Sequence, residues 1–456
     1  MKFARNLALI GMAALAVSGC GVFGGGSKKP KTAVIGERIP ILTSETGVEA
    51  EPSLAGVSIL LPPAVANTEW SQSGGNASKT MEHLALAAAP TQVWSVKIAG
   101  STKYERLAAA PIVAEGRVYA VDTFAKLYAF DAGTGAEIWT KQIGSEADAK
   151  GGTSLWTGEM TGNKGSLFGG GVSYEAGKLY ATSGLGDVVA FNAADGTELW
   201  KVRPGGPLRG APSLGNGSVF VMSQDNQIFA LNETDGSVVW TESASLEVSG
   251  VFGAGAPAVA QGTVVAGFSS GELNAYRYEN GRSLWADALS RTSISTSVAS
   301  LSDVDASPVI DRGRVFAIGQ GGRMVSLDLV TGQRLWEINL AGISTPWVVG
   351  EWVFVIDDGG RLLCLARATG KVRWITQLPN FENIKKKKNP ISWTGPVLAG
   401  DRLILASTDG MMASVSPSDG SIVSQSKLEG GVLLSPVVAN NMMYILTNNG
   451  RLTAWR

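Results

Sequence analysis

A set of landmarks repeated at fixed spacing constrains this 456-residue chain more than any other feature of its sequence. Eight short apolar segments centre on a small residue, and six residues after the first seven of these a glycine follows each time. A proline stands eighteen residues before the small residue in seven of the eight units, and a tryptophan stands ten residues after it in six. The small residues are Ala129, Ala190, Ala230, Ala275, Ser326, Cys364, Ser414 and Ala454, and the tryptophans are Trp139, Trp200, Trp240, Trp285, Trp336 and Trp374, with Ser424 in the seventh unit.

Each landmark suits a set of antiparallel strands. Proline has no N–H and is tolerated where a strand starts or at an edge. Four of the seven glycines follow Asp or Asn, in pairs such as Asp195-Gly196, where a hairpin requires positive φ. A small residue leaves room for a bulky neighbour from the next unit, and we expect that neighbour to be tryptophan. Four strands fit in each unit of about 46 residues, so the sequence predicts an all-β fold, an eight-bladed β-propeller of four-stranded antiparallel blades.

The two ends of the repeat complete one another. The eighth unit stops at Arg456, before its tryptophan strand, while a spare strand with Trp94, residues 91–96, precedes the first complete unit. We therefore expect this N-terminal strand to join the last blade and close the ring, which removes the open edges that an unclosed array would expose.

Insertions fall in one kind of connection. The stretch from the proline position to tryptophan is constant, whereas the links from tryptophan to the next proline position vary from 10 residues after Trp336 to 33 after Trp139, where Val172 replaces the proline. In a four-stranded blade these links leave from the same face as the turns between the second and third strands. One face is therefore elaborated, and elaborated loops on a rigid scaffold usually carry recognition.

The N-terminus carries a targeting pattern. Lys2 and Arg5 precede an apolar run too short to cross a membrane, and the run ends in Val17-Ser18-Gly19-Cys20. This resembles a bacterial lipoprotein signal, which implies cleavage before Cys20, acylation of its thiol and, with Gly21 next, export to the periplasmic face of the outer membrane. A plain secretory peptide is the alternative. We expect a signal peptide at 1–19, a lipid-anchored tether at 20–89 with some order around residues 70–79, and the propeller at 90–456.

Composition excludes several classes of function. The net charge of −1 provides no basic field for nucleic acid. One histidine, His83, and two cysteines, Cys20 and Cys364, cannot supply a zinc cage, a Ser-His-Asp triad or a disulfide framework. We read His83 as structural and Cys364 as a buried space-filler, and we expect no catalytic residue, no metal site and no cofactor.

The unit around Ala129 to Trp139 resembles the repeat of pyrroloquinoline-quinone-type propellers, which include dehydrogenases and non-enzymatic scaffolds. With its lipobox and eight units the chain resembles the BamB family of outer-membrane lipoproteins within that group. Two segments, 207–210 and 301–305, are similar to the family's loops that dock onto the periplasmic domains of a BamA-type barrel. The resemblance implies a scaffold in outer-membrane protein assembly that contacts other assembly lipoproteins and unfolded outer-membrane substrates. It also implies a partner-binding role for Leu208, Arg209, Asp303 and Asp305.

Other interpretations stay open. Taken by themselves, Arg209 fits a local ion pair, and Asp303 and Asp305 fit turn caps. The family's acidic loop in the fourth unit reads Phe268-Ser269-Ser270-Gly271 here.

A quinoprotein dehydrogenase would need calcium, a carboxylate base and, in the alcohol dehydrogenases, adjacent cysteines, but the sequence has no Cys-Cys pair and no Cys-x-x-Cys-His haem site. A propeller that binds cell-wall glycan or another periplasmic partner is a third possibility. The run 385–388, four lysines, favours a solvated loop over a contact with anionic lipid or an acidic partner.

Overall fold

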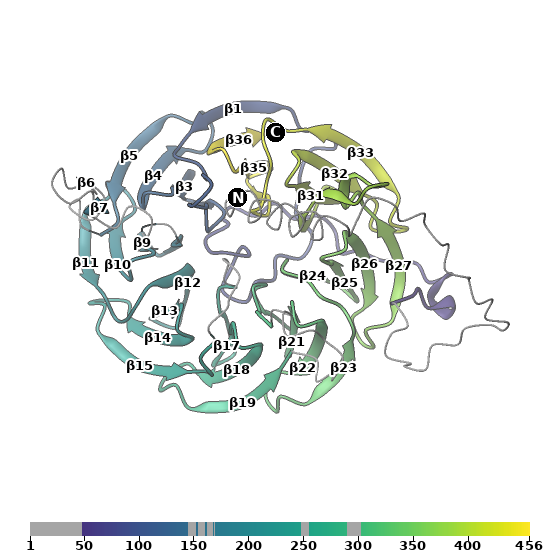
Figure 1. Cartoon of the computed structure of the whole chain (residues 1–456), viewed down its shortest axis with the longest axis horizontal. Coiled ribbons are helices and arrows are strands. Elements are labelled where there is room, and N and C mark those ends of the chain that lie inside the picture. Colours follow the sequence, from purple (N-terminus) through teal and green to yellow (C-terminus); the bar gives the residue numbers. More distant parts are fainter. Residues whose placement is uncertain are drawn as a thin grey trace, which may run out of the picture. The chain divides into compact units, whose positions relative to one another are not determined.

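Eight antiparallel sheets of four strands stand around a common centre (Figure 1), which confirms the expected eight-bladed β-propeller. The computed structural model describes residues 48–144, 167, 169–247, 255–289 and 302–456, and the short strands β6 (Gly152–Thr153) and β7 (Met160–Thr161). The described residues from 48 onward belong to one compact unit. The helical content of this part is the 3₁₀ turn η2 (Pro52–Leu54), and no described helix is long and apolar enough to cross a membrane.

Each blade runs from an inner strand at the ring's centre to an outer strand at its rim. The first four blades consist of β2 (Ile112–Ala114), β3 (Arg117–Val121), β4 (Lys126–Asp131) and β5 (Glu137–Gln142); β8 (Val172–Glu175), β9 (Lys178–Thr182), β10 (Val188–Asn192) and β11 (Glu198–Val202); β12 (Leu208–Gly215), β13 (Ser218–Ser223), β14 (Gln227–Asn232) and β15 (Val238–Ser243); and β16 (Ala258–Ala260), β17 (Thr263–Gly267), β18 (Glu272–Arg277) and β19 (Ser283–Ala288). The next three consist of β20 (Val309–Asp311), β21 (Arg314–Gly319), β22 (Arg323–Asp328) and β23 (Arg334–Ile338); β24 (Trp347–Val349), β25 (Trp352–Ile356), β26 (Arg361–Ala366) and β27 (Val372–Gln377); and β30 (Trp393–Ala399), β31 (Arg402–Ser407), β32 (Met411–Val415) and β33 (Ile422–Lys427).

The eighth blade closes the ring as expected. It combines β34 (Val437–Ala439), β35 (Met442–Leu446) and β36 (Arg451–Trp455) with the N-terminal strand β1 (Gln92–Lys97) as its outer strand. β1 pairs antiparallel with β36, with Trp94 opposite Ala454. The first and last strands of the ring therefore share one sheet.

The tryptophans hold neighbouring blades together. Each stands opposite the small residue of its own blade, as Trp139 stands opposite Ala129. Its indole ring then covers the hairpin glycine of the next blade, as Trp139 covers Gly196. The neighbour expected for the small residue is thus a tryptophan, but from its own blade. Each indole Nε1 also donates to a carbonyl of the next blade: Trp94 to Ala132, Trp139 to Ala193, Trp200 to Glu233, Trp240 to Tyr278, Trp285 to Leu329, Trp336 to Arg367 and Trp374 to Pro417.

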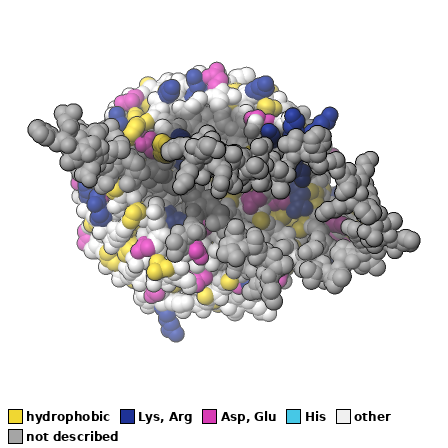
Figure 2. All heavy atoms as spheres, in the orientation of Figure 1, with side chains coloured by type: hydrophobic (Ala, Val, Ile, Leu, Met, Phe, Trp, Pro, Cys, Tyr) yellow, Lys and Arg dark blue, Asp and Glu magenta, His cyan; other side chains and the backbone are white. Residues whose placement is uncertain are grey.

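The blade topology gives the ring two different faces. We call the face that carries the links between blades and the turns between second and third strands the link face, and the opposite one the hairpin face. In the view of Figure 2, basic and acidic side chains are intermixed over the described surface. The ring therefore shows no single-signed field in that view.

A segment before the ring, residues 67–84, forms hydrogen bonds with the inner strand of every blade. We call it the central segment, and Figure 1 shows this part of the chain inside the ring. Its partners are Val113, Tyr174, Leu214, Val259, Ile310, Trp347, Leu398 and Val438, one from each of the eight blades.

This arrangement corrects the expected tether at 20–89 in its C-terminal part. Inner strands are sheet edges, and their inward N–H and C=O groups need partners. The central segment supplies such partners around the whole ring, so the packed unit begins well before residue 90.

Candidate partner-binding face

The two segments expected to bind a partner meet on the link face. Arg209 opens β12 of blade 3, and Asp305 lies in the link that leads to β20 of blade 5. An Arg209 Nη2 atom lies 3.4 Å from Asp305 Oδ1, although 96 residues separate the two. Their side chains are only 9% and 6% exposed. The pair therefore connects blade 3 with the link before blade 5. We call the opening of the ring's centre on the link face, where this pair lies, the mouth of the ring.

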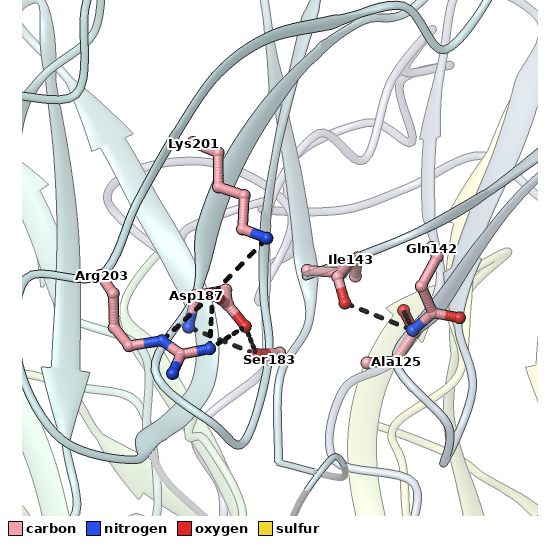
Figure 3. A network of polar contacts seen from close by, with 7 residues as sticks. All are labelled: Ala125, Gln142, Ile143, Ser183, Asp187, Lys201 and Arg203. Carbon is pink, nitrogen blue, oxygen red and sulfur yellow. Dashed lines mark hydrogen bonds and ion pairs between the residues drawn. The ribbon is translucent and has the colours of Figure 1, made fainter. Parts of the chain in front are cut away.

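A polar network around the buried carboxylate of Asp187 holds the start of the link that leads to Arg209 (Figure 3). Asp187, in the turn between β9 and β10, accepts from Arg203 Nη2 at 2.9 Å and Nε at 3.2 Å. Ser183 Oγ donates to Asp187 Oδ2 at 3.0 Å, and Lys201 Nζ lies 4.0 Å from Asp187 Oδ1. Gln142 makes an equivalent tie in blade 1, where its amide donates to Ala125 O at 3.2 Å. Through these contacts, the start of the link between blades 2 and 3 is attached to the turn between β9 and β10.

Leu208 and Asp303 lie inside the ring wall. The Leu208 side chain is fully buried, in a cluster with Tyr180, Val188 and Phe229. Asp303 is also buried, and its carbonyl accepts from Gln320 N–H at 2.9 Å. Sequence reasoning assigned Leu208 to a pocket of a partner, whereas the structure places it in the ring's own core.

Burial raises the pKa of two carboxyl groups at the mouth of the ring. Burial, and then the neighbouring Asp303, raise the pKa of Asp305 to about 7, while Arg209 acts in the opposite direction. Burial and Asp357 raise the pKa of Asp358, which also faces this cluster, to about 6. No described hydrogen-bond partner reaches Asp305 Oδ2. The charge of the mouth therefore changes near neutral pH.

A cavity of about 350 Å³ lies at this mouth, and Asp305 lines its wall. Trp347 and Trp393 supply apolar surface, and Trp70 and Lys79 of the central segment also line the cavity. Lys79 Nζ donates to Ser213 Oγ at 3.1 Å, and burial lowers the pKa of the amine to about 7. The sequence indicates some order around residues 70–79 but predicts no role for Lys79, because the segment around it has no periodic pattern.

The remaining predicted residues lie elsewhere. Cys20 lies outside the described residues. Cys364 is buried opposite Trp374, and burial raises the pKa of its thiol. His83 is buried in the central segment, where Nδ1 lies 2.8 Å from Pro62 O and Nε2 accepts from Asp401 N–H at 3.1 Å. Over the described ranges, no three His, Cys, Asp or Glu side chains converge as metal ligands.

Comparison with known proteins decides the family. The family model described as outer membrane protein assembly factor BamB matches residues 81–150, 145–376 and 382–455. The chain belongs to the BamB family. BamB of Moranella endobia is 26% identical over 80% of this chain and 90% of the relative. BamB of Escherichia coli strain K12 is 29% identical over 79% of this chain and 87% of the relative.

Solved structures share the fold with this BamB-family chain. The crystal structure of BamB from Moraxella catarrhalis superposes with a TM-score of 0.61 at 19% identity, covering 81% of this chain and all of that one. Quinohemoprotein alcohol dehydrogenase from Comamonas testosteroni superposes with a TM-score of 0.62 at 14% identity, over 86% of this chain and 81% of that one. At these identities the likeness concerns the fold alone, so the propeller does not distinguish a scaffold from a dehydrogenase.

Proposed function

We propose that the chain is a non-enzymatic assembly factor for outer-membrane proteins, anchored through an acylated Cys20 at the periplasmic face of the outer membrane. Its link face binds the periplasmic domains of a BamA-type barrel, beside other assembly lipoproteins, and assists insertion of barrel substrates. The observation that carries this proposal is the BamB family match, which extends from residue 81 to residue 455 and so runs through every blade.

The geometry of the link face supports a docking role. Arg209 and Asp305 hold a guanidinium and its carboxyl partner in a defined geometry at the mouth of the ring, and groups held in this way favour specific recognition over loose attraction. Arginine is also enriched at the energetic centres of protein interfaces. In this proposal Arg209 and Asp305 form the contact, and the buried Leu208 and Asp303 contribute by holding the start of β12 and the link before β20 in place.

The residues present do not fit the site of a quinoprotein dehydrogenase. Calcium needs six or more converging oxygens, and the described carboxylates include no cluster of metal-ligand type. The sequence has no pair of adjacent cysteines, and Cys364 is buried in blade 6. We therefore derive no chemical step for this chain.

Arg209→Ala should weaken capture of a BamA-type barrel from detergent-solubilised outer membranes by about tenfold or more, as expected for a desolvated interface arginine. Arg282→Ala is the matched control, because Arg282 is exposed in a hairpin turn of blade 4 on the opposite face. Leu208→Ala is unsuitable, since a cavity at this buried position would cost ~2–5 kcal/mol of stability. Melting temperatures of both arginine variants separate a loss of binding from a loss of folding.

Equal capture by Arg209→Ala and wild type would contradict the assigned contact, and no capture by wild type would contradict the partner itself. Arg209→Lys keeps the charge and should retain part of the binding. Turnover in a dye-reduction assay after addition of pyrroloquinoline quinone and Ca²⁺ would instead support the dehydrogenase.

A further inference from the structure

The link between blades 6 and 7 carries a small hairpin that lies outside the ring's sheets. After β27 (Figure 1), strand β28 (Phe381–Asn383) pairs antiparallel with β29 (Lys388–Pro390) as a separate two-stranded sheet. All nine residues from 382 to 390 are exposed. Because the hairpin belongs to a link between blades, it emerges on the link face.

The tip of this hairpin has a defined turn. Asn383 Oδ1 accepts from Lys386 N–H at 3.0 Å, and Ile384 O accepts from Lys387 N–H at 3.4 Å. At the base, Asn389 Nδ2 donates to Glu382 Oε2 at 2.6 Å. The tip therefore presents its side chains from a folded turn.

The tip concentrates positive charge. It carries Lys385, Lys386, Lys387 and Lys388 against one acidic residue, Glu382, so its net charge is 4 − 1 = +3 in a chain of net charge −1. The lysine ion pairs found across the described ranges involve Lys178, Lys201 and Lys371, and none involves the tip. Four amines are thus available to an external anion.

An apolar side chain stands beside these amines. Ile384 is 68% exposed at the same turn. An acidic protein would form ion pairs with the amines, but this isoleucine would stay exposed to water unless the protein also had an apolar pocket for it. A bilayer surface accommodates both, because phosphate headgroups attract lysine and the boundary of the acyl chains accepts apolar side chains. Lysine also suits such a surface because its ammonium is a compact point charge on a flexible stem.

We propose that the hairpin 381–390 is a membrane contact that binds bilayers containing anionic phospholipid. In this arrangement the four lysines lie among the phosphates, and Ile384 enters the interface. The hairpin would add a second attachment to the anchor proposed at Cys20 and orient the link face. The partner-binding role of Arg209 and Asp305 is independent of this contact.

Vesicle sedimentation tests the proposal with residues 20–456 carrying Cys20→Ala, so that neither a leader nor an acyl chain contributes. The vesicles are phosphatidylcholine alone, or an equal mixture with phosphatidylglycerol. Wild type should sediment with the mixed vesicles only, and added salt should release it. Changing residues 385–388 together from Lys to Gln should weaken this binding by about tenfold or more, and Ile384→Ser by a few-fold.

The matched control changes Lys97, Lys103, Lys141 and Lys427 to Gln. It alters the net charge by the same amount at dispersed sites of the ring, and it should bind about as well as wild type. All variants keep Lys28, Lys29 and Lys31, so any contribution from these lysines is common to them. Equal loss in the control, full binding by the 385–388 variant, or no binding of wild type to the mixed vesicles would each overturn the proposal. Unchanged melting temperatures will show that the ring is intact.

Discussion

At the scale of single residues, Lys79 places an amine at the centre of the ring without a carboxylate partner among the described residues. Its side chain is 4% exposed, and its ammonium donates to Ser213 Oγ, which in turn donates to Pro257 O at 2.6 Å. Burial alone lowers the pKa of Lys79 from 10.5 to about 7. Between these values the unfolded chain binds more protons than the folded one, so this residue makes stability rise with pH across that interval, and below it the penalty stays at its full, constant value.

Lys79→Met should therefore stabilise the ring at neutral pH. The apolar side chain fits the same space, and Ser213 keeps its bond to Pro257, so the free energy of unfolding should rise by ~1–4 kcal/mol at pH 7, as for other buried charges replaced by apolar groups. The gain should shrink as pH rises from 7 toward 10.5, because the wild-type amine becomes neutral in both states only above its unfolded pKa of 10.5. Denaturant unfolding at several pH values measures this, with Lys427→Met on the exposed edge as control. A gain independent of pH would point to packing rather than charge.

Residue-level prediction succeeded where a residue type recurs at fixed spacing. Seven tryptophans and their glycines could be placed from the sequence because each pair repeats one contact across a seam between blades. Leu208 and Asp305 occur once, and their burial depends on links that do not repeat. No pattern in the sequence could show that Arg209 meets Asp305 across the mouth.

At the scale of elements, the central segment acts on every blade at once. It buries Trp70, which stacks against Trp347 with ring centroids 6.2 Å apart, and it pairs with all eight inner strands. Its sequence mixes Gly, Ser, Asn and Thr and has no regular alternation of apolar and polar residues. It makes mostly one backbone hydrogen bond to each inner strand rather than a continuous strand pairing. For this reason the propeller can be predicted from its repeats, whereas for the segment the sequence indicates only a tether with some order around residues 70–79.

A series of N-terminal truncations separates the central segment from the closing strand. A chain starting at residue 62 should melt close to the full chain, because it keeps the Pro62 carbonyl beside His83. A chain starting at residue 87 should lose at least about 3 kcal/mol, the cost of removing one buried tryptophan. A chain starting at residue 98 also lacks β1 and should lose cooperative unfolding, since blade 8 then has an open edge. Circular dichroism melts measure all three, and equal melting of the first two would contradict the role of the central segment.

At the scale of the whole molecule, the ring has one seam built differently from the others. Seven seams pair a tryptophan with a glycine of the next blade, but Ser424 replaces the tryptophan of blade 7. Blade 8 has no hairpin between its third and outer strands to supply such a glycine, because its outer strand is β1 from the N-terminal part of the chain. The missing tryptophan and the missing glycine therefore fall on the same seam, and both follow from closing the ring with the N-terminal strand.

We expect the seam between blades 7 and 8 to open first. Every residue of β33 is exposed, whereas β27, the equivalent strand of blade 6, buries Val372 and Trp374. β27 and β33 pair with the third strands of their own blades in the same register, including the bulge after the small residue. A difference between them in the rate of amide hydrogen exchange would therefore come from the contact with the next blade. Hydrogen exchange should be roughly tenfold faster in 422–427 than in 372–377, the effect of losing one indole bond and its packing. Trp374→Ser should bring β27 to the rate of β33, and equal rates in wild type would show that all eight seams open together.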